Sequence, residues 1–329
     1  MSEDTNDWRR FYHSADAVEN VQEPEFLIEG FLQVQAICAI AAPVGQRKTL
    51  IALNVVHALC TGEPLFGHFK VPNVVDKVLY LCPEMGLISF KKRIESIGLL
   101  PHIGKNFFCR TMSSVVAHQP RDMTPEEIKG AVIILDTVVR FLEGDENSSE
   151  HMRYFAEQVF ELVQRGALAV IVLAHSQKGT VKSDELTLEN CLRGSSELGA
   201  FLTSCWATKL QTPDDYYGPS LLKNVKQRDF ESKSFEVTSG PDCRLHFVEG
   251  SGGAVVKMKS TGNRDGKQDT ADAIIRQNPK LKGPALVKEL ALAGIERSNN
   301  WVCQRRKKLR LEDLDAKGPH GVTRSSSAG

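Results

Sequence analysis

The chain has 329 residues, 41% of them hydrophobic, so it can bury a full core in one large or two smaller domains. Its 41 basic and 41 acidic side chains give a formal net charge of zero, which excludes a uniformly basic nucleic-acid binder and leaves a local patch for that role. No apolar run approaches the length of a membrane span, and the eight cysteines form no C-x-x-C pair. We therefore expect a cytoplasmic protein with reduced thiols and no membrane partner.

Residues 1–24 are polar and are predicted to form an N-terminal arm. Four later runs are continuously apolar, and since strands without alternation are buried on both faces, they predict a central, mainly parallel sheet. These runs are 36–41, 78–82, 131–135 and 167–174. The helical patterns between them, each closed by a glycine, are 49–59, 87–97 and 150–164. The alternation predicts a doubly wound α/β domain over residues 25–250.

The end of this domain contains short strand candidates separated by turn signals, which indicate hairpins added to the same sheet. They are 205–210, 221–227, 234–238 and 244–248. Residues 251–269 are rich in Gly, Lys and Ser and are predicted to be a linker. Three short helical patterns, at residues 270–277, 283–293 and 298–309, predict a helix-turn-helix or winged-helix module over 270–314, and residues 315–329 are expected to be disordered.

Residues 41–49, with the sequence AAPVGQRKT, follow the first apolar run and open a helical pattern. An apolar strand, a Gly/Pro turn and Lys-Thr at a helix start are typical of a phosphate-binding loop, in which backbone N–H groups face a polyphosphate. The match to G-x-x-x-x-G-K-[ST] is imperfect, because Ala42 and Arg47 stand at the glycine positions. An ordinary strand–turn–helix with a surface lysine is the alternative. The residues expected to contact a nucleotide are Pro43, Val44, Gly45, Gln46, Arg47, Lys48 and Thr49.

Three polar residues follow other predicted strands. Asp136 follows the third apolar run, which is the form of a Walker B segment whose carboxylate holds Mg²⁺. Glu84 follows the second run and could accept a proton from an attacking water, although it could also cap the next helix. His175 follows the fourth run. If that strand lies between the phosphate-loop strand and the Asp136 strand, the imidazole lies beside the γ-phosphate; a purely structural histidine is the alternative.

Five motifs follow one another along the chain, at residues 42–49, 83–86, 134–141 with 145–147, 172–176 and 193–196. In this order they resemble the RecA-like ATPases of the plasmid RepA-type hexameric helicase group, over about residues 25–250. The resemblance implies a RecA-like fold with ATP and Mg²⁺ as cofactors. The site residues that it implies are Lys48 for phosphate, Thr49 and Asp136 for Mg²⁺, Glu84 as general base and His175 as γ-phosphate sensor.

The same group has a Lys-x-Arg on a late strand that reaches the nucleotide of the adjacent subunit. Lys226-Gln227-Arg228 matches that pattern, so the resemblance implies that Lys226 and Arg228 are catalytic and that Arg228 is an arginine finger. An exposed basic pair on a strand is the plain alternative. Arg47 departs from the group, because glycine at that position lets the loop approach the phosphates. Its charge could instead assist binding, so we expect nucleotide binding and leave the rate of turnover open.

The basic residues that cluster in the third C-terminal helical pattern are Arg305, Arg306, Lys307 and Lys308. On one face of such a helix they would suit contacts to DNA phosphates and base edges, and a solvated charged helix end is the alternative. In RecA-like rings the loop after the sensor strand faces the central pore. The resemblance therefore adds Lys178 and Lys182 as DNA-binding candidates.

Together these features predict a Mg²⁺-ATP-hydrolysing RecA-like motor. By the resemblance it is a homo-oligomeric, ring-forming and hexameric DNA helicase of plasmid or mobile-element replication that moves on single-stranded DNA. Two other functions are compatible with the residues. One is a DNA-binding regulator in which nucleotide sets the oligomeric state and hydrolysis is slow, and the other is a scaffold that does not hydrolyse nucleotide.

Overall fold

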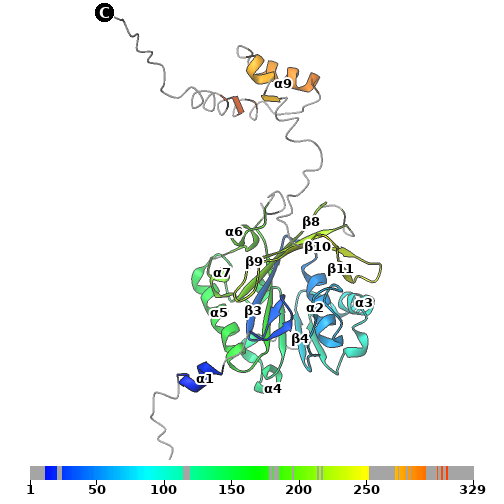
Figure 1. Cartoon of the computed structure of the whole chain (residues 1–329), viewed down its shortest axis with the longest axis vertical. Helices are drawn as coiled ribbons and strands as arrows, with labels where there is room; N and C mark the ends of the chain where they lie inside the picture. Colours follow the sequence, from blue (N-terminus) through cyan, green and yellow to red (C-terminus); the bar gives the residue numbers. More distant parts are fainter. Residues whose placement is uncertain are drawn as a thin grey trace, which may run out of the picture. The chain divides into compact units, whose positions relative to one another are not determined.

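The chain forms two compact units, Met1–Val256 and Lys257–Gly329 (Figure 1). The computed structural model describes residues 12–20, 24–113, 119–177, 180, 185–194, 196–212, 215, 218–251, 271–272, 274–278, 281, 283–293, 302, 305–306 and 309. No helix among these residues is long and apolar enough to cross a membrane.

The first unit is organised around a nine-stranded sheet with the strand order β11-β10-β9-β8-β3-β7-β6-β4-β5. The strands are β3 Ala36–Ala42, β4 Val78–Cys82, β5 Phe107–Thr111, β6 Val132–Asp136, β7 Ala169–His175, β8 Ser204–Leu210, β9 Ser220–Lys226, β10 Ser234–Ser239 and β11 Leu245–Phe247. The six strands from β8 to β5 in this order pair in parallel, and β9, β10 and β11 extend the β8 side in antiparallel pairs. The predicted mainly parallel sheet is therefore confirmed. A separate two-stranded sheet joins β1 Phe26–Ile28 to β2 Leu32–Gln33.

Helices cover both faces of the large sheet. The described helices are α1 Ala15–Glu19, α2 Lys48–Thr61, α3 Leu87–Ile97, α4 Pro125–Ile128, α5 Ser149–Gln164, α6 Leu188–Cys191, α7 Ser196–Phe201 and α9 Gly283–Leu292, with short 3₁₀ turns η2 Leu100–His102, η3 Pro120–Asp122 and η4 Val138–Arg140. One face packs against α2 and α3 through a cluster that contains Leu53 and Phe90. The other packs against α5 and α7 through a cluster that contains Phe155 and Leu198. Figure 1 shows these two helix pairs on either side of β3.

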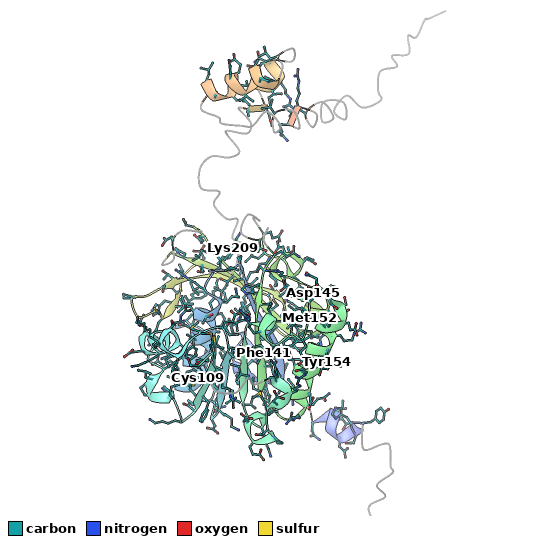
Figure 2. The ribbon with its side chains drawn as sticks, turned by 180° about the vertical axis from the view of Figure 1, so that it is seen from behind. Cys109, Phe141, Asp145, Met152, Tyr154 and Lys209 are labelled. Atoms are coloured by element: carbon teal, nitrogen blue, oxygen red, sulfur yellow. The ribbon has the colours of Figure 1, made fainter. Side chains whose placement is uncertain are left out.

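The central strands are buried because their side chains are apolar on both faces. All seven residues of β3 are buried, with Ile40 in the α2-side cluster and Ala41 in the α5-side cluster. Phe141 and Met152, labelled in Figure 2, belong to the α5-side cluster as well. We call the edge at which β3, β4, β6 and β7 end the carboxyl edge, and the opposite one the amino edge. Since these four strands are parallel, the polar residues that follow them lie at the carboxyl edge.

In the second unit, α9 matches the second predicted C-terminal helical pattern. Its Leu286 and Leu290 are buried with Ala271 and Val302 in a small apolar cluster. The described parts of the first and third patterns contain helical residues too. The predicted domain boundaries and the helix-turn-helix assignment stay predictions. Most of the predicted linker and all of the predicted tail lie outside the described residues.

Candidate active site

The candidate phosphate loop connects the end of β3 to the start of α2. Its backbone has φ angles of 76° at Gly45 and 66° at Arg47, so Arg47 adopts the left-handed conformation that glycine usually supplies. The Arg47 side chain is 4% exposed, and its Nη1 donates to Ser220 Oγ of β9 at 3.1 Å. Next to it, Gln46 Oε1 accepts a hydrogen bond from the backbone N–H of Leu210, at the end of β8 (2.6 Å). Both side chains therefore extend toward the β8–β9 pair.

Lys48 is the first residue of α2 and is 6% exposed. Its Nζ donates to the carbonyl oxygens of Ala42 at 3.0 Å and Pro43 at 3.3 Å, and lies 3.1 Å from Nδ1 of His175. Burial lowers the pKa of Lys48 to about 8, and the charges of two nearby carboxylates limit that fall. Lys48 is therefore protonated at neutral pH and presents a cation at the loop, where phosphate oxygens would compete with the two carbonyl groups.

Asp136 ends β6 and is 3% exposed. Its Oδ2 accepts hydrogen bonds from Thr49 Oγ1 at 3.0 Å and from the Tyr80 hydroxyl at 2.9 Å, and the Cys82 thiol lies 3.7 Å from the same oxygen. Burial raises the pKa of Asp136, and the hydrogen bonds from Tyr80 and Thr49 oppose that rise. A hydroxyl and a carboxylate oxygen are ligands that Mg²⁺ prefers, so Thr49 and Asp136 fit a Mg²⁺ site.

Glu84 lies in the turn between β4 and α3. Its Oε1 accepts a hydrogen bond from Arg140 Nε at 2.6 Å and one from Thr137 Oγ1 at 3.3 Å. Gly86 is the N-cap of α3, and the first N–H of that helix, at Leu87, donates to Ser113 Oγ at 3.2 Å, so the structure does not show the alternative in which Glu84 is a cap. The contact with Arg140 has no signal in the sequence, because the two residues are 56 positions apart.

His175 ends β7, and β7 lies between β3 and β6, as the sequence interpretation required for a γ-phosphate sensor. Burial, followed by the charge of Lys48, lowers the pKa of His175, so the ring is neutral at neutral pH and Nδ1 accepts from Lys48. The backbone carbonyl of His175 accepts a hydrogen bond from the N–H of Arg193 at 2.8 Å. Arg193 also forms an ion pair with Glu146, so the loops after η4 and α6 meet beside this histidine.

The predicted Lys-x-Arg pair lies at the other edge of the sheet. Because β9 runs antiparallel to β8, it begins at Ser220 beside the phosphate loop and ends at Lys226, opposite Cys205. At about 3.4 Å per residue, the seven residues of β9 place its two ends about 20 Å apart. Arg228 follows at the amino edge, so it does not reach the phosphate loop of its own chain.

The two basic side chains of this pair have different surroundings. Lys226 Nζ donates to the carbonyl oxygens of Gly199 at 2.7 Å and Ala200 at 3.1 Å, and burial lowers the pKa of Lys226. Arg228 is exposed and, with Asp229, lines a cavity of about 750 Å³ at the amino edge. The structure thus brings the loop, Glu84, Asp136 and His175 together and leaves Lys226 and Arg228 outside that site.

The DNA-binding candidates divide into two groups. Those outside the described residues are Lys178, Lys182, Lys307 and Lys308. Arg305 forms an ion pair with Asp272 at 2.5 Å and its side chain is 16% exposed, while Arg306 Nη1 donates to the carbonyl oxygen of Leu281 at 2.8 Å. Both described arginines bind groups of their own unit, and these contacts favour a structural role for them over the predicted contact with DNA.

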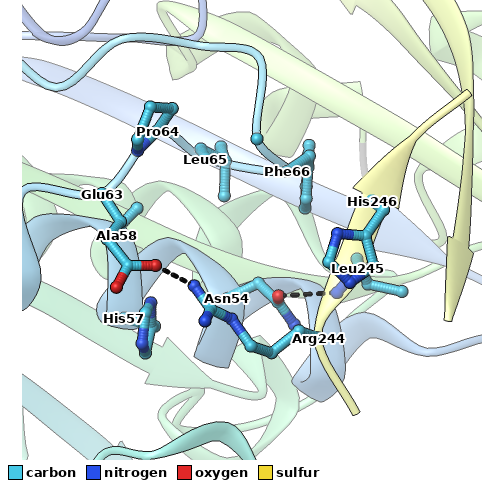
Figure 3. Close-up of a pocket in the computed structure, with 11 residues that line it drawn as sticks. Asn54, His57, Ala58, Glu63, Pro64, Leu65, Phe66, Arg244, Leu245 and His246 are labelled. Carbon is cyan, nitrogen blue, oxygen red and sulfur yellow. Dashed lines mark hydrogen bonds and ion pairs between the residues drawn. The ribbon is translucent and has the colours of Figure 1, made fainter. Parts of the chain in front are cut away.

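Another cavity, of about 280 Å³, lies between α2 and β11 (Figure 3). Asn54 Oδ1 accepts a hydrogen bond from the backbone N–H of Leu245 at 2.9 Å, and Glu63 forms an ion pair with Arg244 (Figure 3). Burial and the Arg244 charge lower the pKa of His57, which lines the same cavity. These residues come from Asn54 and later positions of α2 and from the segments beyond it, so this cavity is separate from the phosphate loop.

The strand order and the loop geometry are those of the RecA-like P-loop NTPase fold. Two solved structures share this fold. One, described as an ATPase domain, matches with a TM-score of 0.50 and 13% identity, over 65% of this chain and 85% of its own. The other, a DnaB-like replicative helicase described with its interactions with primase, matches with a TM-score of 0.50 and 14% identity, over 71% of this chain and 66% of its own.

The family described as AAA domain matches residues 10–181, which is more than half of the chain. The chain belongs to this family. No curated protein matches it.

Proposed function

We propose that this chain hydrolyses Mg²⁺-ATP and works as a helicase-like motor on single-stranded DNA. One observation carries the proposal: the side chains that follow β3, β6 and β7 meet at the carboxyl edge, where Lys48 lies 3.1 Å from His175 and Thr49 lies 3.0 Å from Asp136. Glu84, which follows β4, lies at the same edge. A cation, two Mg²⁺ ligands and a carboxylate base are the groups that phosphoryl transfer to water requires.

Each group has a defined task. Lys48 and the loop N–H groups would bind phosphate oxygens at the N-terminus of α2. Thr49 and Asp136 would hold Mg²⁺, which neutralises phosphate charge when bound. Glu84 would accept a proton from water while the water oxygen bonds to the γ-phosphorus and the bond to the bridging oxygen of ADP breaks, which releases ADP and phosphate. His175, through its contact with Lys48, would register the presence of the γ-phosphate.

Assembly is the second part of the proposal. Arg228 is exposed at the amino edge, about 20 Å from the start of β9 beside the phosphate loop, so a role in phosphoryl transfer requires the site of a neighbouring copy. We infer a homo-oligomer, a hexameric ring, in which Arg228 stabilises charge on the transferring phosphoryl group of the next subunit. The likeness to a DnaB-like replicative helicase supports this form of the proposal.

In such a ring, Lys178 and Lys182 follow the sensor strand and are proposed to contact single-stranded DNA. Lys307 and Lys308 of the C-terminal unit are proposed to contact DNA phosphates. The setting that suits these parts is cytoplasmic replication of a plasmid or mobile element.

The test measures the ATPase rate of the full chain with and without single-stranded DNA, together with its mass in the presence of nucleotide. We expect DNA-stimulated hydrolysis, a nucleotide-dependent oligomer and displacement of a strand from a forked duplex. Glu84→Gln should bind ATP with little change and lose hydrolysis, because an amide cannot take the proton from water. An equal loss of binding and hydrolysis would instead make Glu84 structural.

Two outcomes would select the other candidate functions. Nucleotide-dependent assembly with slow hydrolysis and no strand displacement would identify a DNA-binding regulator. Failure to bind a fluorescent ATP analogue would identify a scaffold, and it would contradict the proposal as a whole.

A further inference from the structure

We propose that Arg140 is a positioning residue for the base Glu84, a role that rests on the proposed hydrolysis of ATP. Among the described residues, the two hydrogen bonds to the Glu84 carboxylate both end on Oε1, from Arg140 Nε at 2.6 Å and from Thr137 Oγ1 at 3.3 Å. Both donors come from the segment that directly follows Asp136, the proposed Mg²⁺ ligand. Glu84 is thereby hydrogen-bonded to the segment that begins with Asp136, the residue proposed to hold Mg²⁺.

The segment that carries Arg140 is held firmly by the core. The turn η4 is closed by hydrogen bonds from Arg140 N to Thr137 O and from Phe141 N to Val138 O, both at 2.9 Å. Val138 and Phe141 are 3% and 2% exposed and belong to the α5-side core cluster. These buried neighbours fix the backbone at Arg140, so its exposed guanidinium reaches Glu84 from an anchored position in the chain.

Glu84 itself lies on a less constrained segment. It is in the turn between β4 and α3, and its side chain is 34% exposed. A glutamate side chain has several rotatable bonds, and an unanchored one samples many rotamers. Catalysis by a base requires its oxygen within hydrogen-bond reach of the proton that it accepts. With Oε1 held by Arg140 and Thr137, the carboxylate keeps one orientation and Oε2 is the oxygen left to face the attacking water.

Stability does not explain this ion pair. The side chains of Arg140 and Glu84 are 57% and 34% exposed, and ion pairs with such exposure contribute little to the free energy of unfolding. The guanidinium Nε–H is a directional donor, whereas a lysine ammonium is a point charge on a flexible stem. If Arg140 sets the orientation of the Glu84 carboxylate, a lysine at position 140 should support only part of the wild-type rate of ATP hydrolysis.

The first measurement separates the catalytic rate from nucleotide binding. Arg140→Ala should lower kcat about 10- to 100-fold, because a base displaced by about 1 Å loses that much. The affinity for a fluorescent ATP analogue should stay within about twofold of the wild-type value, since Arg140 acts on the base and not on the nucleotide. Arg140→Lys should recover part of the rate. The matched control is Arg121→Ala, which breaks the exposed ion pair of Arg121 with Glu143 and should leave kcat unchanged.

The second measurement asks whether Arg140 acts through Glu84. In a Glu84→Gln background, Arg140→Ala should cause no further loss of the residual rate, because no base remains to be positioned. In the nucleotide-free protein, hydrogen exchange of the amides of residues 84–86 should become faster in Arg140→Ala and stay unchanged in Arg121→Ala. This last readout does not depend on activity.

The outcomes distinguish the inference from the proposed function. If Glu84→Gln is inactive and Arg140→Ala turns over ATP at or above the wild-type rate, Arg140 does not position the base and the proposed function stands. If the losses of the two single variants multiply in the double variant, Arg140 acts independently of Glu84, which also overturns the inference. Full hydrolysis by Glu84→Gln, or no hydrolysis by the wild-type chain, contradicts the proposed function itself and the positioning role with it.

Discussion

The two edges of the central sheet present their charged groups differently. At the carboxyl edge the groups bind one another: Lys48 lies 3.1 Å from His175, and Asp136 accepts a hydrogen bond from Thr49. At the amino edge Arg228 is exposed, beyond the end of β9. The difference follows from strand direction, because parallel strands deliver the residues that follow them to one edge and the antiparallel β9 delivers its own to the other.

This contrast suits different roles for the two edges in the proposed function. The carboxyl edge contains the groups to which the proposed function assigns nucleotide binding and hydrolysis, whereas Arg228 is exposed at the amino edge. If the Arg228 cation belongs to the reaction, two copies of the chain are needed to build one site. The following experiments test the role of each edge, in order of decreasing expected effect.

The largest effect is expected for Lys48→Ala, which removes a buried cation of the carboxyl edge and leaves Arg47 in place. Loss of its charge-assisted contacts should weaken the binding of a fluorescent ATP analogue about 100-fold or more and abolish turnover. Lys92→Ala, on the exposed face of α3, is the control and should bind normally. Wild-type affinity in Lys48→Ala would remove the phosphate loop assignment.

Arg228→Ala tests the amino edge. Nucleotide binding should stay nearly intact while turnover falls about 10³-fold, because the lost cation stabilises the transferring phosphoryl group. Mixing this variant with Lys48→Ala should restore part of the activity, since some interfaces then pair an intact Lys48 with an intact Arg228. Arg153→Ala, an exposed arginine of α5, should turn over ATP at the wild-type rate. No restoration at any mixing ratio would contradict both the finger and the ring.

A pH titration of nucleotide affinity tests how burial controls the charge of Lys48 at the carboxyl edge. Because burial lowers the pKa of Lys48 to about 8, its ammonium loses the proton above that pH, and the loop then keeps only the charge of Arg47. Affinity for the ATP analogue should begin to fall above neutral pH, reach about half its neutral-pH value near the pKa, and then fall by at most about tenfold per pH unit. Lys48→Ala should show no such dependence. An affinity that stays level up to the ordinary range of lysine would show that burial does not control this charge.

The smallest effect is expected for Tyr80→Phe, which removes one of the donors to Asp136 without changing the shape of the side chain. Urea unfolding should report a loss of about 1.5–3 kcal/mol, the typical cost of a hydrogen bond to a charged group. Tyr154→Phe is the control, because that side chain is exposed on α5 and should change little. An unchanged midpoint in Tyr80→Phe would show that Asp136 does not need this donor.

Much of the fold could be predicted because its central strands are continuous apolar runs. The strand β3 is buried along its whole length, and α2 and α3 end at glycines with positive φ, at Gly62 and Gly98. The strand β5, Phe107–Thr111, was not predicted, because it lies at the edge of the sheet and only its first and last residues are buried. The helices α6 and α7 also had no clear signal, since each spans fewer than two turns.

The site was predictable to the extent that its residues follow strands. Asp136, Glu84 and His175 each come directly after an apolar run, so their common edge follows from a parallel sheet. The partners of these residues were not predictable, because they are set by tertiary packing. Tyr80 reaches Asp136 across two neighbouring strands, and Arg140 reaches Glu84 over 56 positions in the sequence.

The strand β9 has a further consequence. At its first residue, Ser220 is bound by Arg47 of the phosphate loop, and the neighbouring end of β8 is bound at Leu210 by Gln46 of the same loop. Beyond its last residue stands Arg228. A paired strand moves as one unit along its length. In the proposed ring, the first residue of the seven-residue strand β9 contacts the phosphate loop of its own chain, and Arg228, beyond the last residue, would reach the nucleotide of the neighbouring chain. Occupancy of one site would then set the position of the cation in the next, and successive sites would hydrolyse ATP in sequence around the ring.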